Sequence, residues 1–477
     1  MPASESKTRT ELLWAGVAIV AAAAALRFAA SFGDLWLDEI WSWSLTLNLS
    51  SAWSILTEIE HDNNHFLNTF VIYLLGPNAS PWLYRFPAVL AGVGSVIVAG
   101  RIARRQGAFE SVAAMLLVGG SYLCIHYSSE ARGYAYVALF APLSFLLLER
   151  ALEKPRWTRC LAFAAVAVLG FLSHLVYVFC FAALVLWSLV HVWRTRRGRL
   201  CLVACHLPPA VFAFWLYLET VRGVVVGGSD ARPLSEILAG TLSLALGGPE
   251  SAGPWRLVAA AITLLVLVAA LVQACRTAGD RWIFYVAVLL GPLLLLLHPE
   301  RQFLHARHFL IPTLFLLILA AGLLGRLWAS GSRGKWACGI ALLLFLAANS
   351  YQTERLIRLG RGNYKEALDR MVAETRGPVT RLAGDHDFRN GLLFFYYKRT
   401  MPDPEALYYY TAQRVPDSGT EWYLRHSTAL QYEAEPILSD TRGNRYLLVE
   451  VYPFAGLSGW HWAVYRHERA LRAEATE

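Results

Sequence analysis

Long apolar runs separated by short polar loops dominate the first three quarters of the chain. Each run holds roughly 17–25 residues, the length that a helix needs to cross about 30 Å of hydrocarbon. The pattern predicts eleven transmembrane helices, at 11–31, 83–101, 108–126, 134–150, 160–174, 175–193, 200–218, 256–275, 282–298, 308–327 and 336–351. His174 divides an apolar stretch only just long enough for two of them. Residues 1–351 therefore read as an all-α polytopic membrane module.

The pattern changes after residue 351. Residues 352–477 are mixed charged and polar, with no apolar run long enough to span a membrane. Residues 365–376 have helical periodicity, and 379–383, 447–452 and 460–465 read as strands. We expect a small C-terminal α/β domain.

Composition and charge give the orientation. The chain is 56% hydrophobic and only 16% charged, which is far too apolar for a soluble protein of 477 residues. Its net charge of +8 comes mainly from basic loops, which alternate along the chain as cytoplasmic loops do. They lie at 101–105, 150–159, 194–199, 276–281 and 326–335. The charge thus indicates topology and not nucleic-acid binding: the N-terminus is expected in the cytoplasm and the C-terminal domain outside it.

Two further features shape this interpretation. The first apolar run is too long for the core of a signal peptide, so we expect a retained anchor. The seven cysteines contain no CxxC, which argues against a disulfide framework or a zinc finger. Cys201 and Cys205 share a helical face and are interpreted as packing residues.

The acidic segment 32–75 stands out because it contains no Lys or Arg. If 36–47 is helical, Asp38 and Glu39 share one arc with Ser42 and Thr46. The opposite arc carries Trp36, Ile40, Trp43 and Leu47. This predicts an amphipathic helix in the outer membrane interface with its carboxylates turned to water. The acids of this helix are either catalytic residues of an enzyme or simply its solvated face.

Other polar residues are expected at the outer ends of different helices, so that a bundle would gather them on one surface. They are Arg85, Glu130, Arg132, His174, Arg307 and His308, with His61, Asp62 and His65 in the acidic segment. An acid can activate a nucleophile, and guanidiniums can hold a phosphate and neutralise it as it leaves. Such a surface suits a substrate with a phosphate in the headgroup zone and a lipid tail between helices.

Several of these residues lie in strings that resemble GT-C-type glycosyltransferases, and more closely the bacterial relatives of protein O-mannosyltransferases and of the lipid A aminoarabinose transferase. The strings, in order, are LWLDEIWS, DNNHFLNT, YRFPAVLAGVGSVIVAGRIARR, SSEARGYAYVALFAPLSFLLLERAL, SHLVYVF and ARHFLIPTLFLLILAAGLL. The resemblance covers roughly residues 10–330. It implies a multi-pass enzyme of the bacterial inner membrane, with a GT-C-type fold, that transfers a hexose or pentose from a polyprenyl phosphate. The acceptor would be a lipid-linked glycan, a surface polysaccharide or a protein outside the cytoplasm.

The resemblance also implies roles for the matching positions. Asp38 would be the general base on the acceptor hydroxyl, supported by Glu39. Polyprenyl phosphate leaves as a stabilised anion, so no general acid is needed, and in-line attack would invert the sugar. The donor phosphate would be bound by Arg307, Arg132, Arg85 and His308. Other contacts with the substrate would come from His61, Asp62, His65, Glu130 and His174. Where many relatives have His-Pro-Pro, this chain has Asn63-Asn64-His65-Phe66, which leaves the acceptor class open.

Each assignment has a structural alternative. Arg307 and His308 could be interfacial side chains that reach for water, and Glu130 and Arg132 a local ion pair. Arg85 could anchor a helix start, and His174 could be a hydrogen-bonded core residue. A divalent cation could bind His61, Asp62 and His65 with Asp38, although their spacing matches no zinc signature.

Two other functions compete with the enzyme. A lipid or lipid-linked sugar transporter would place charges near the bilayer midplane, where this sequence has few. A non-catalytic scaffold would tolerate neutralisation of the acids in segment 32–75.

Overall fold

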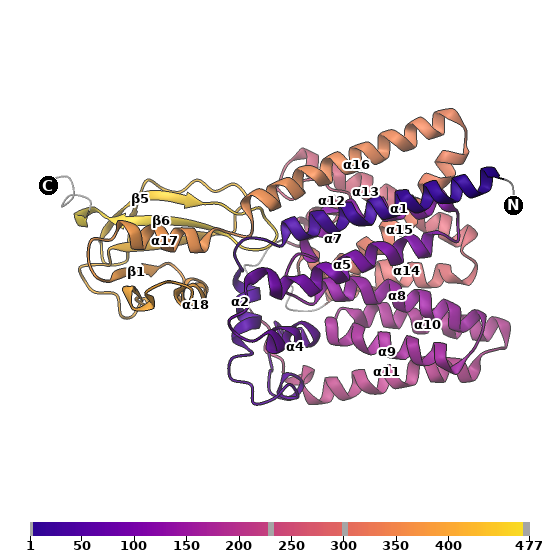
Figure 1. Ribbon diagram of the computed structural model, residues 1–477, viewed down its shortest axis with the longest axis horizontal. Helices are drawn as coiled ribbons and strands as arrows, with labels where there is room; N and C mark the ends of the chain where they lie inside the picture. Colours follow the sequence, from indigo (N-terminus) through magenta and orange to yellow (C-terminus); the bar gives the residue numbers. More distant parts are fainter. Residues whose placement is uncertain (1–2, 228–232, 298–303, 471–477) are drawn as a thin grey trace. The chain divides into compact units, whose positions relative to one another are not determined.

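The chain divides into two compact units, which are described here one at a time. The computed structural model describes residues 3–227, 233–297 and 304–470 (Figure 1). The first unit comprises Met1–Ser31 and Leu45–Thr353, and the second comprises Phe32–Ser44 and Glu354–Glu477. The sequence predicts a single boundary near residue 351 and keeps 32–44 in the membrane module. In the structure, these thirteen residues group with the C-terminal ones instead.

The first unit is a bundle of apolar helices. Within its described residues, eight spans are long and apolar enough to cross a membrane, which makes the chain an integral multi-pass membrane protein. They lie on α1 (Ala3–Ala30), α5 (Pro81–Ala103), α8 (Tyr134–Glu153), α10 (Tyr177–Thr195), α11 (Arg199–Glu219), α13 (Pro254–Thr277), α14 (Trp282–Leu290) and α15 (Leu310–Ala329). Shorter helices are α3 (Ser54–Thr57), α4 (Phe66–Leu75), α6 (Ala108–Gly120), α7 (Tyr122–Tyr127), α9 (Trp157–Ser173) and α12 (Leu234–Ala245). Helix α16 (Ser332–Leu359) runs on into the second unit.

The count of eight differs from the predicted eleven for local reasons. The run at 108–126 is broken at Ser121, whose extended backbone separates α6 from α7. The run at 160–193 does divide at His174, but α9 has only 17 residues. The run at 336–351 lies within α16, where charged residues at both ends dilute its hydropathy.

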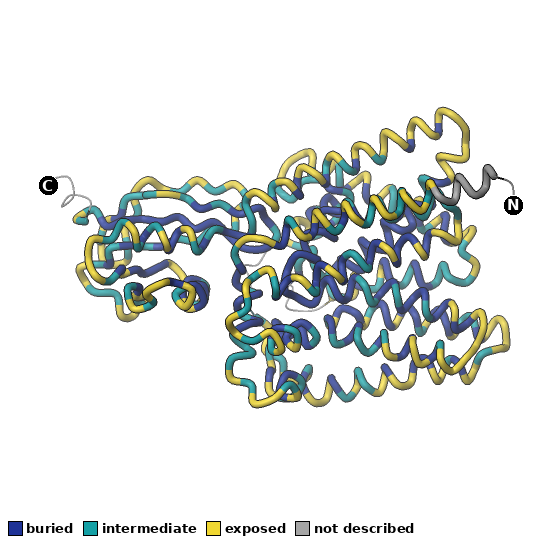
Figure 2. Tube along the Cα trace, viewed as in Figure 1, coloured by how far each residue is buried: buried dark blue, intermediate teal, exposed yellow. Residues whose placement is uncertain are grey.

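Burial separates the core of the bundle from its periphery (Figure 2). Most residues of α15, α8 and α5 are buried, whereas most of α1, α11 and α13 are exposed. The exposed positions include large apolar side chains such as Leu207, Phe214 and Leu265. Apolar side chains make no hydrogen bonds, so in a bilayer such exposed positions can face the lipid tails.

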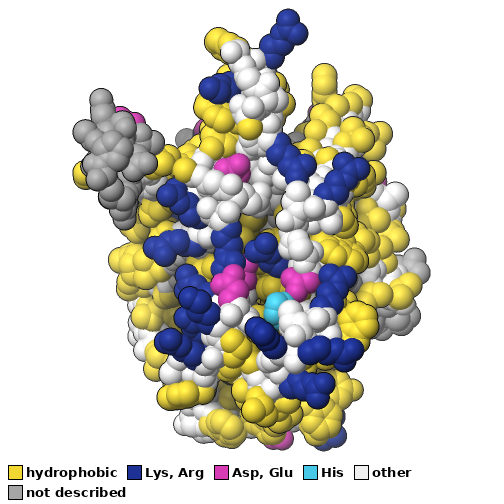
Figure 3. Space-filling view, turned by 90° about the vertical axis from the view of Figure 1, so that its right-hand side faces the viewer, with side chains coloured by type: hydrophobic (Ala, Val, Ile, Leu, Met, Phe, Trp, Pro, Cys, Tyr) yellow, Lys and Arg dark blue, Asp and Glu magenta, His cyan; other side chains and the backbone are white. Residues whose placement is uncertain are grey.

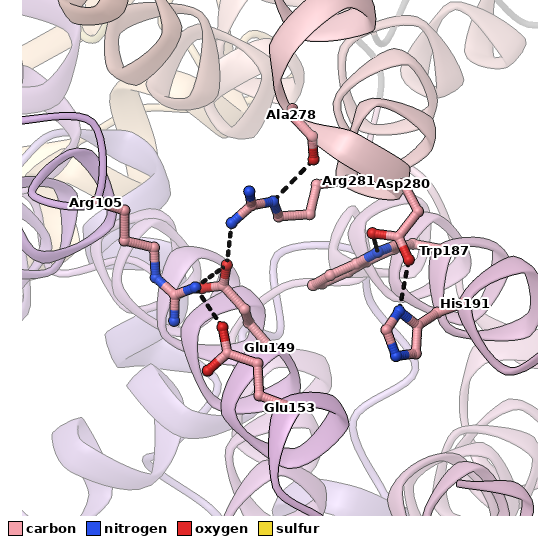
Figure 4. Close-up of polar contacts among 8 residues, drawn as sticks. All are labelled: Arg105, Glu149, Glu153, Trp187, His191, Ala278, Asp280 and Arg281. Atoms are coloured by element: carbon pink, nitrogen blue, oxygen red, sulfur yellow. Dashed lines mark hydrogen bonds and ion pairs between the residues drawn. The ribbon is translucent and has the colours of Figure 1, made fainter. Parts of the chain in front are cut away.

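The basic loops meet at one end of the bundle. Figure 3 shows Lys and Arg side chains gathered there around a few acidic ones and a histidine. In Figure 4, Glu149 of α8 accepts from Arg105 at 2.5 Å and from Arg281 at 2.7 Å, and it is 3% exposed. Nearby, Asp280 pairs with His191 at 2.5 Å and accepts from the indole of Trp187 at 3.2 Å. These pairs join the ends of α5, α8, α10 and α14.

The second unit contains a six-stranded sheet in the order β2-β1-β3-β6-β5-β4. β1 is parallel to β2 and β3, and the other pairs are antiparallel. The strands are β1 (Thr380–Gly384), β2 (Leu407–Tyr409), β3 (Trp422–Ser427), β4 (Ile437–Ser439), β5 (Arg445–Tyr452) and β6 (His461–His467). The helices are α17 (Tyr364–Glu374) and α18 (Asp387–Lys398). The predicted helix at 365–376 and the three predicted strands are confirmed.

The segment that carries Asp38 is part of this second unit. It forms α2 (Leu37–Ser44), and its Trp43 ring lies 4.9 Å from the ring of Tyr396 on α18. The carbonyl of Leu35 accepts from the hydroxyl of Tyr397 at 2.8 Å, and Asp34 accepts from the first turn of α17 at 2.7 Å. The prediction that the apolar face of this helix lies in the membrane interface is therefore wrong, because this face packs against protein.

Candidate functional site

The candidate site in the first unit is built around Arg132, in the turn between α7 and α8. Its side chain is 3% exposed, and Nη2 donates to Oδ1 of Asn63 at 2.7 Å. The guanidinium also lies 5.2 Å from the ring centre of Tyr134. A Cβ on the neighbouring Gly133 would collide with the carbonyl of Ser173, so only glycine allows these segments to approach so closely. Three stretches far apart in sequence thus meet at this turn.

Histidines from two of these stretches lie against each other, with tilted rings, beside Arg132. His65, which precedes α4, and His174, between α9 and α10, have ring centres 4.8 Å apart. Tyr134 lies 5.3 Å from His65 and 4.5 Å from His174. Nδ1 of His174 accepts from the amide of Val176 at 3.1 Å, and Nε2 of His65 is buried without a hydrogen-bond partner among the described residues.

Arg307 and His308 join this group from the start of α15. The ring of His308 lies 6.3 Å from that of His174, and its Nδ1 accepts from the amide of His305 at 3.1 Å. The charge of Arg307 acts on both His65 and His174, as does that of Arg132. We call His65, Arg132, His174, Arg307 and His308 the Arg–His cluster.

Electrostatics keep two of these imidazoles neutral. Burial, and then the positive charges around them, hold the pKa of His65 and of His174 well below the usual value. The cluster at neutral pH therefore combines two guanidiniums with uncharged imidazoles. Guanidiniums and imidazole N–H groups are both hydrogen-bond donors to anions.

The remaining predicted residues of the first unit surround the cluster at different depths. Glu130 is fully buried and pairs with Nε2 of His126 at 3.1 Å. Asp62 pairs with His61 at 3.0 Å and accepts from the amide of Gly227 at 3.2 Å. Burial raises the pKa of Asp62, but these two hydrogen bonds and the charge of Arg132 bring it below its usual value.

Arg85 has a structural contact. It is fully buried on α5, where Nη1 donates to the carbonyl of Ser31 at 3.0 Å. This bond ties the start of α5 to the end of α1. The contact agrees with the alternative that Arg85 anchors a helix start.

The predicted acids Asp38 and Glu39 lie in the second unit and differ from each other. Glu39 is 1% exposed, and its Oε2 accepts from the amide of Trp36 at 3.2 Å at the start of α2. Asp38 is half-buried in the first turn. The prediction that both carboxylates turn to water is wrong for Glu39, because its side chain caps its own helix.

In the part of the chain that the structure describes, His61, Asp62 and His65 are not among the side chains whose ligand atoms converge closely enough to hold an ion. His61 instead forms its hydrogen bonds with Asp62 and with the amide of Asn63.

Sequence reasoning missed four residues of the site: Asn63, His126, Gly133 and Tyr134. Asn63, Gly133 and Tyr134 lie inside the strings DNNHFLNT and SSEARGYAYVALFAPLSFLLLERAL, and His126 lies just before the second string. Their polarity and spacing gave no individual signal, because an amide, a glycine and a tyrosine are common at helix ends. Only the fold brings them together.

The chain is thus a multi-pass membrane protein with a candidate anion site. Two guanidiniums and neutral imidazoles form this site at the ends of the helices. Residues 65–218, about a third of the chain, match the family described as Dolichyl-phosphate-mannose-protein mannosyltransferase. The match contains most of the Arg–His cluster and supports the resemblance to GT-C-type membrane glycosyltransferases. No curated protein matches the sequence.

Three solved structures resemble the fold at low identity. Arabinosyltransferase EmbB from Mycobacterium smegmatis is 13% identical over 74% of this chain, with a TM-score of 0.36, and the match spans 43% of its length. ArnT from Cupriavidus metallidurans in the apo state is 14% identical over 94% of this chain and 97% of its own, with a TM-score of 0.38. The structure of the same protein bound to undecaprenyl phosphate is 13% identical over 94% of this chain and 97% of its own, with a TM-score of 0.36. With such low scores, no functional conclusion follows from these three likenesses.

Proposed function

We propose that the chain is a glycosyltransferase that moves a sugar from a polyprenyl-phosphate donor to a hydroxyl acceptor on the extracytoplasmic side of the membrane. One observation carries the proposal: the rings of His65, His174 and His308 gather at helix ends beside Arg132, with centres 4.8 Å apart for His65 and His174 and 6.3 Å apart for His174 and His308. The family match over residues 65–218 supports it, because that family is described by a lipid-phosphate sugar. The acceptor is a glycan, a lipid or a protein, and the sugar is a hexose or a pentose.

The Arg–His cluster is the proposed phosphate site. Two guanidiniums hold the phosphate of the donor and stabilise the negative charge that develops as the sugar–oxygen bond breaks. His65 and His174, being neutral, donate N–H bonds to phosphate or sugar oxygens without adding a titrating charge. Tyr134 holds both rings in place, and Asn63 orients Arg132.

Asp38 is the proposed base. Its carboxylate takes the proton of the acceptor hydroxyl as the oxygen attacks the anomeric carbon, and polyprenyl phosphate leaves from the opposite face with inversion. Glu39, buried and bonded to the amide of Trp36, fixes the start of α2 and thereby orients Asp38. No step requires a nucleotide.

The orientation of the chain follows from its charges. α8 and α15 begin at the Arg–His cluster and end in basic loops, so the cluster lies at the opposite end of the bundle from the basic face in Figure 3. By the positive-inside tendency the basic end belongs in the cytoplasm. The N-terminus is then cytoplasmic, and the cluster is extracytoplasmic in the inner membrane.

The test is donor cleavage by the purified full chain in lipid nanodiscs. A panel of polyprenyl-phosphate sugars is supplied with candidate acceptors, and released polyprenyl phosphate is measured. Arg132→Gln and Arg307→Gln should each lower kcat/KM about 10- to 100-fold, because each removes charged hydrogen bonds worth about 1.5–3 kcal/mol. Arg104→Gln, an exposed arginine of the basic end, should leave the rate unchanged.

Two outcomes would overturn the proposal. One is equal rates in the cluster variants and the wild type. The other is movement of the intact donor across the bilayer without cleavage, which is the behaviour of a transporter.

A further inference from the structure

A cluster of three cysteines lies outside the site described above. Cys160 belongs to α9, and Cys201 and Cys205 lie one turn apart on α11. The Sγ atoms of Cys160 and Cys201 are 3.3 Å apart, and those of Cys201 and Cys205 are 3.8 Å apart. All three sulfurs lie within 4.8 Å of one another, and all three residues are buried. The sequence alone suggests packing for Cys201 and Cys205, because the third thiol comes from another helix.

The spacing fits sulfurs that share one ion. Thiolates bound to a single zinc at about 2.3 Å lie about 3.8–4.0 Å from one another. Two of the separations, 3.3 and 3.8 Å, lie at or just below this value, and the third is within 4.8 Å, so small rotations of the side chains would bring all three sulfurs onto a common centre. The i, i+4 spacing on α11 places two ligands on one face, and α9 supplies the third.

The surroundings favour thiolates. Cys160 and Cys201 both lie near the N-terminal ends of their helices, where the helix dipole stabilises negative charge. Arg159, next to Cys160, is held in place by hydrogen bonds to the carbonyls of Arg150 at 2.9 Å and Lys154 at 3.1 Å. The site belongs to the basic end of the bundle.

We propose that Cys160, Cys201 and Cys205 bind one thiophilic d10 cation, with Zn²⁺ as the favoured ion. An all-sulfur ligand set selects soft or borderline metals over Mg²⁺ or Ca²⁺. Three thiolates with Zn²⁺ carry a net charge of −1, against −2 with Cu⁺, and the smaller charge costs less to bury. Binding releases the three thiol protons and involves no redox step. The ion would join α9 to α11 at the basic end of the bundle.

The experiment uses the full chain, purified under reducing conditions in detergent with an affinity tag that contains no histidine. Cd²⁺ is titrated into the apo protein, and the ultraviolet thiolate-to-metal charge-transfer absorption is followed. Bound zinc is measured separately by mass spectrometry of the metal. We expect one ion per chain in the wild type and in Cys275→Ser, whose exposed cysteine lies elsewhere on α13. Cys201→Ser should weaken binding more than tenfold.

The wild-type titration decides the matter even if a variant fails to fold. Absence of a charge-transfer band at one equivalent of Cd²⁺ would mean that the cysteines are packing residues only. A band of equal strength and affinity in Cys201→Ser would place the ion elsewhere and also overturn the proposal. Neither result bears on donor cleavage, because this inference does not depend on the proposed function.

Discussion

At the scale of single residues, the informative feature is that amide and aromatic side chains position the groups of the candidate site. Arg132 is positioned by the amide of Asn63 and the ring of Tyr134, and His65 and His174 lie against each other. These contacts fix the position of the guanidinium relative to the two imidazoles.

The two imidazoles give the protein a defined acid sensitivity. Because the pKa of His65 and His174 in the folded protein lies below the unfolded value of about 6.5, the unfolded chain binds more protons in acid. The resulting stability is fully present above about pH 6.5 and is lost as the pH falls toward the folded pKa. We expect the melting temperature of the wild type to fall between pH 7 and pH 5.

The melting temperature of the double variant His65→Asn/His174→Asn should fall less between pH 7 and pH 5. This variant has no imidazoles at these two positions, so the unfolded chain no longer gains two protons that the folded protein does not bind. Differential scanning fluorimetry of both proteins in detergent across the pH range measures this. Melting curves that shift in parallel with pH would contradict the assignment of neutral imidazoles.

At the scale of elements, polar bonds at the basic end join several helices of the bundle. Glu149 is the centre of this arrangement, since one carboxylate oxygen accepts from both Arg105 and Arg281 (Figure 4). The three residues belong to different parts of the bundle: the loop after α5, the end of α8 and the turn before α14. A single side chain therefore fixes the spacing of three segments.

Glu149→Gln should destabilise the bundle by about 2 kcal/mol. A fully buried pair that loses one charge costs about 3–5 kcal/mol, and this value is reduced because both arginines are about a third exposed. Glu153 offers a matched control on the same helix, because its carboxylate also contacts Arg105 but is 54% exposed. Glu153→Gln should change the free energy of unfolding by less than about 0.5 kcal/mol. Equal effects in thermal unfolding would refute the role of burial.

Most helices and strands could be predicted from the sequence, because they follow from the pattern of apolar and polar residues within each segment. The lengths of the apolar runs predicted the spans from α5 to α15, and alternation predicted β1, β5 and β6. The surroundings of the helix at 36–47 were not accessible. Its apolar arc indicates only that this side avoids water, and an arc of Trp and Ile suits a membrane interface or a protein partner equally well. The partner, Tyr396 of α18, lies far along the chain.

The candidate site was predictable in part for a similar reason. Charge at helix ends identified Arg132, His174, Arg307 and His308 one by one. Their mutual contacts depend on Gly133, which allows the turn before α8 to reach the carbonyl of Ser173. A long-range contact of this kind leaves no periodic trace in the sequence.

At the scale of the whole molecule, the residues proposed for phosphate binding and for base catalysis belong to different units. The Arg–His cluster belongs to the first unit, and Asp38 belongs to the second. A scaffold that presents the C-terminal domain would tolerate the loss of Asp38, whereas the proposed transferase would not.

Asp38→Asn should abolish sugar transfer, because the amide cannot accept the proton of the acceptor hydroxyl. The protein should remain inserted and folded, with an unchanged melting temperature. Transfer is measured with the donor and acceptor pair that the wild type uses. Asp369→Asn, an exposed acid on α17 of the same unit, serves as the control and should remain active. Retained transfer in Asp38→Asn would rule out this residue as the base.

The way the chain enters the second unit also has a consequence for biosynthesis. Residues Phe32–Ser44 emerge from the ribosome among the earliest, yet the indole of Trp43 packs on Phe395 and Tyr396, which are translated near the end. A chain whose synthesis stops before α18 therefore lacks these partners. We expect such truncated chains to expose this indole and to be degraded by proteases faster than the full chain.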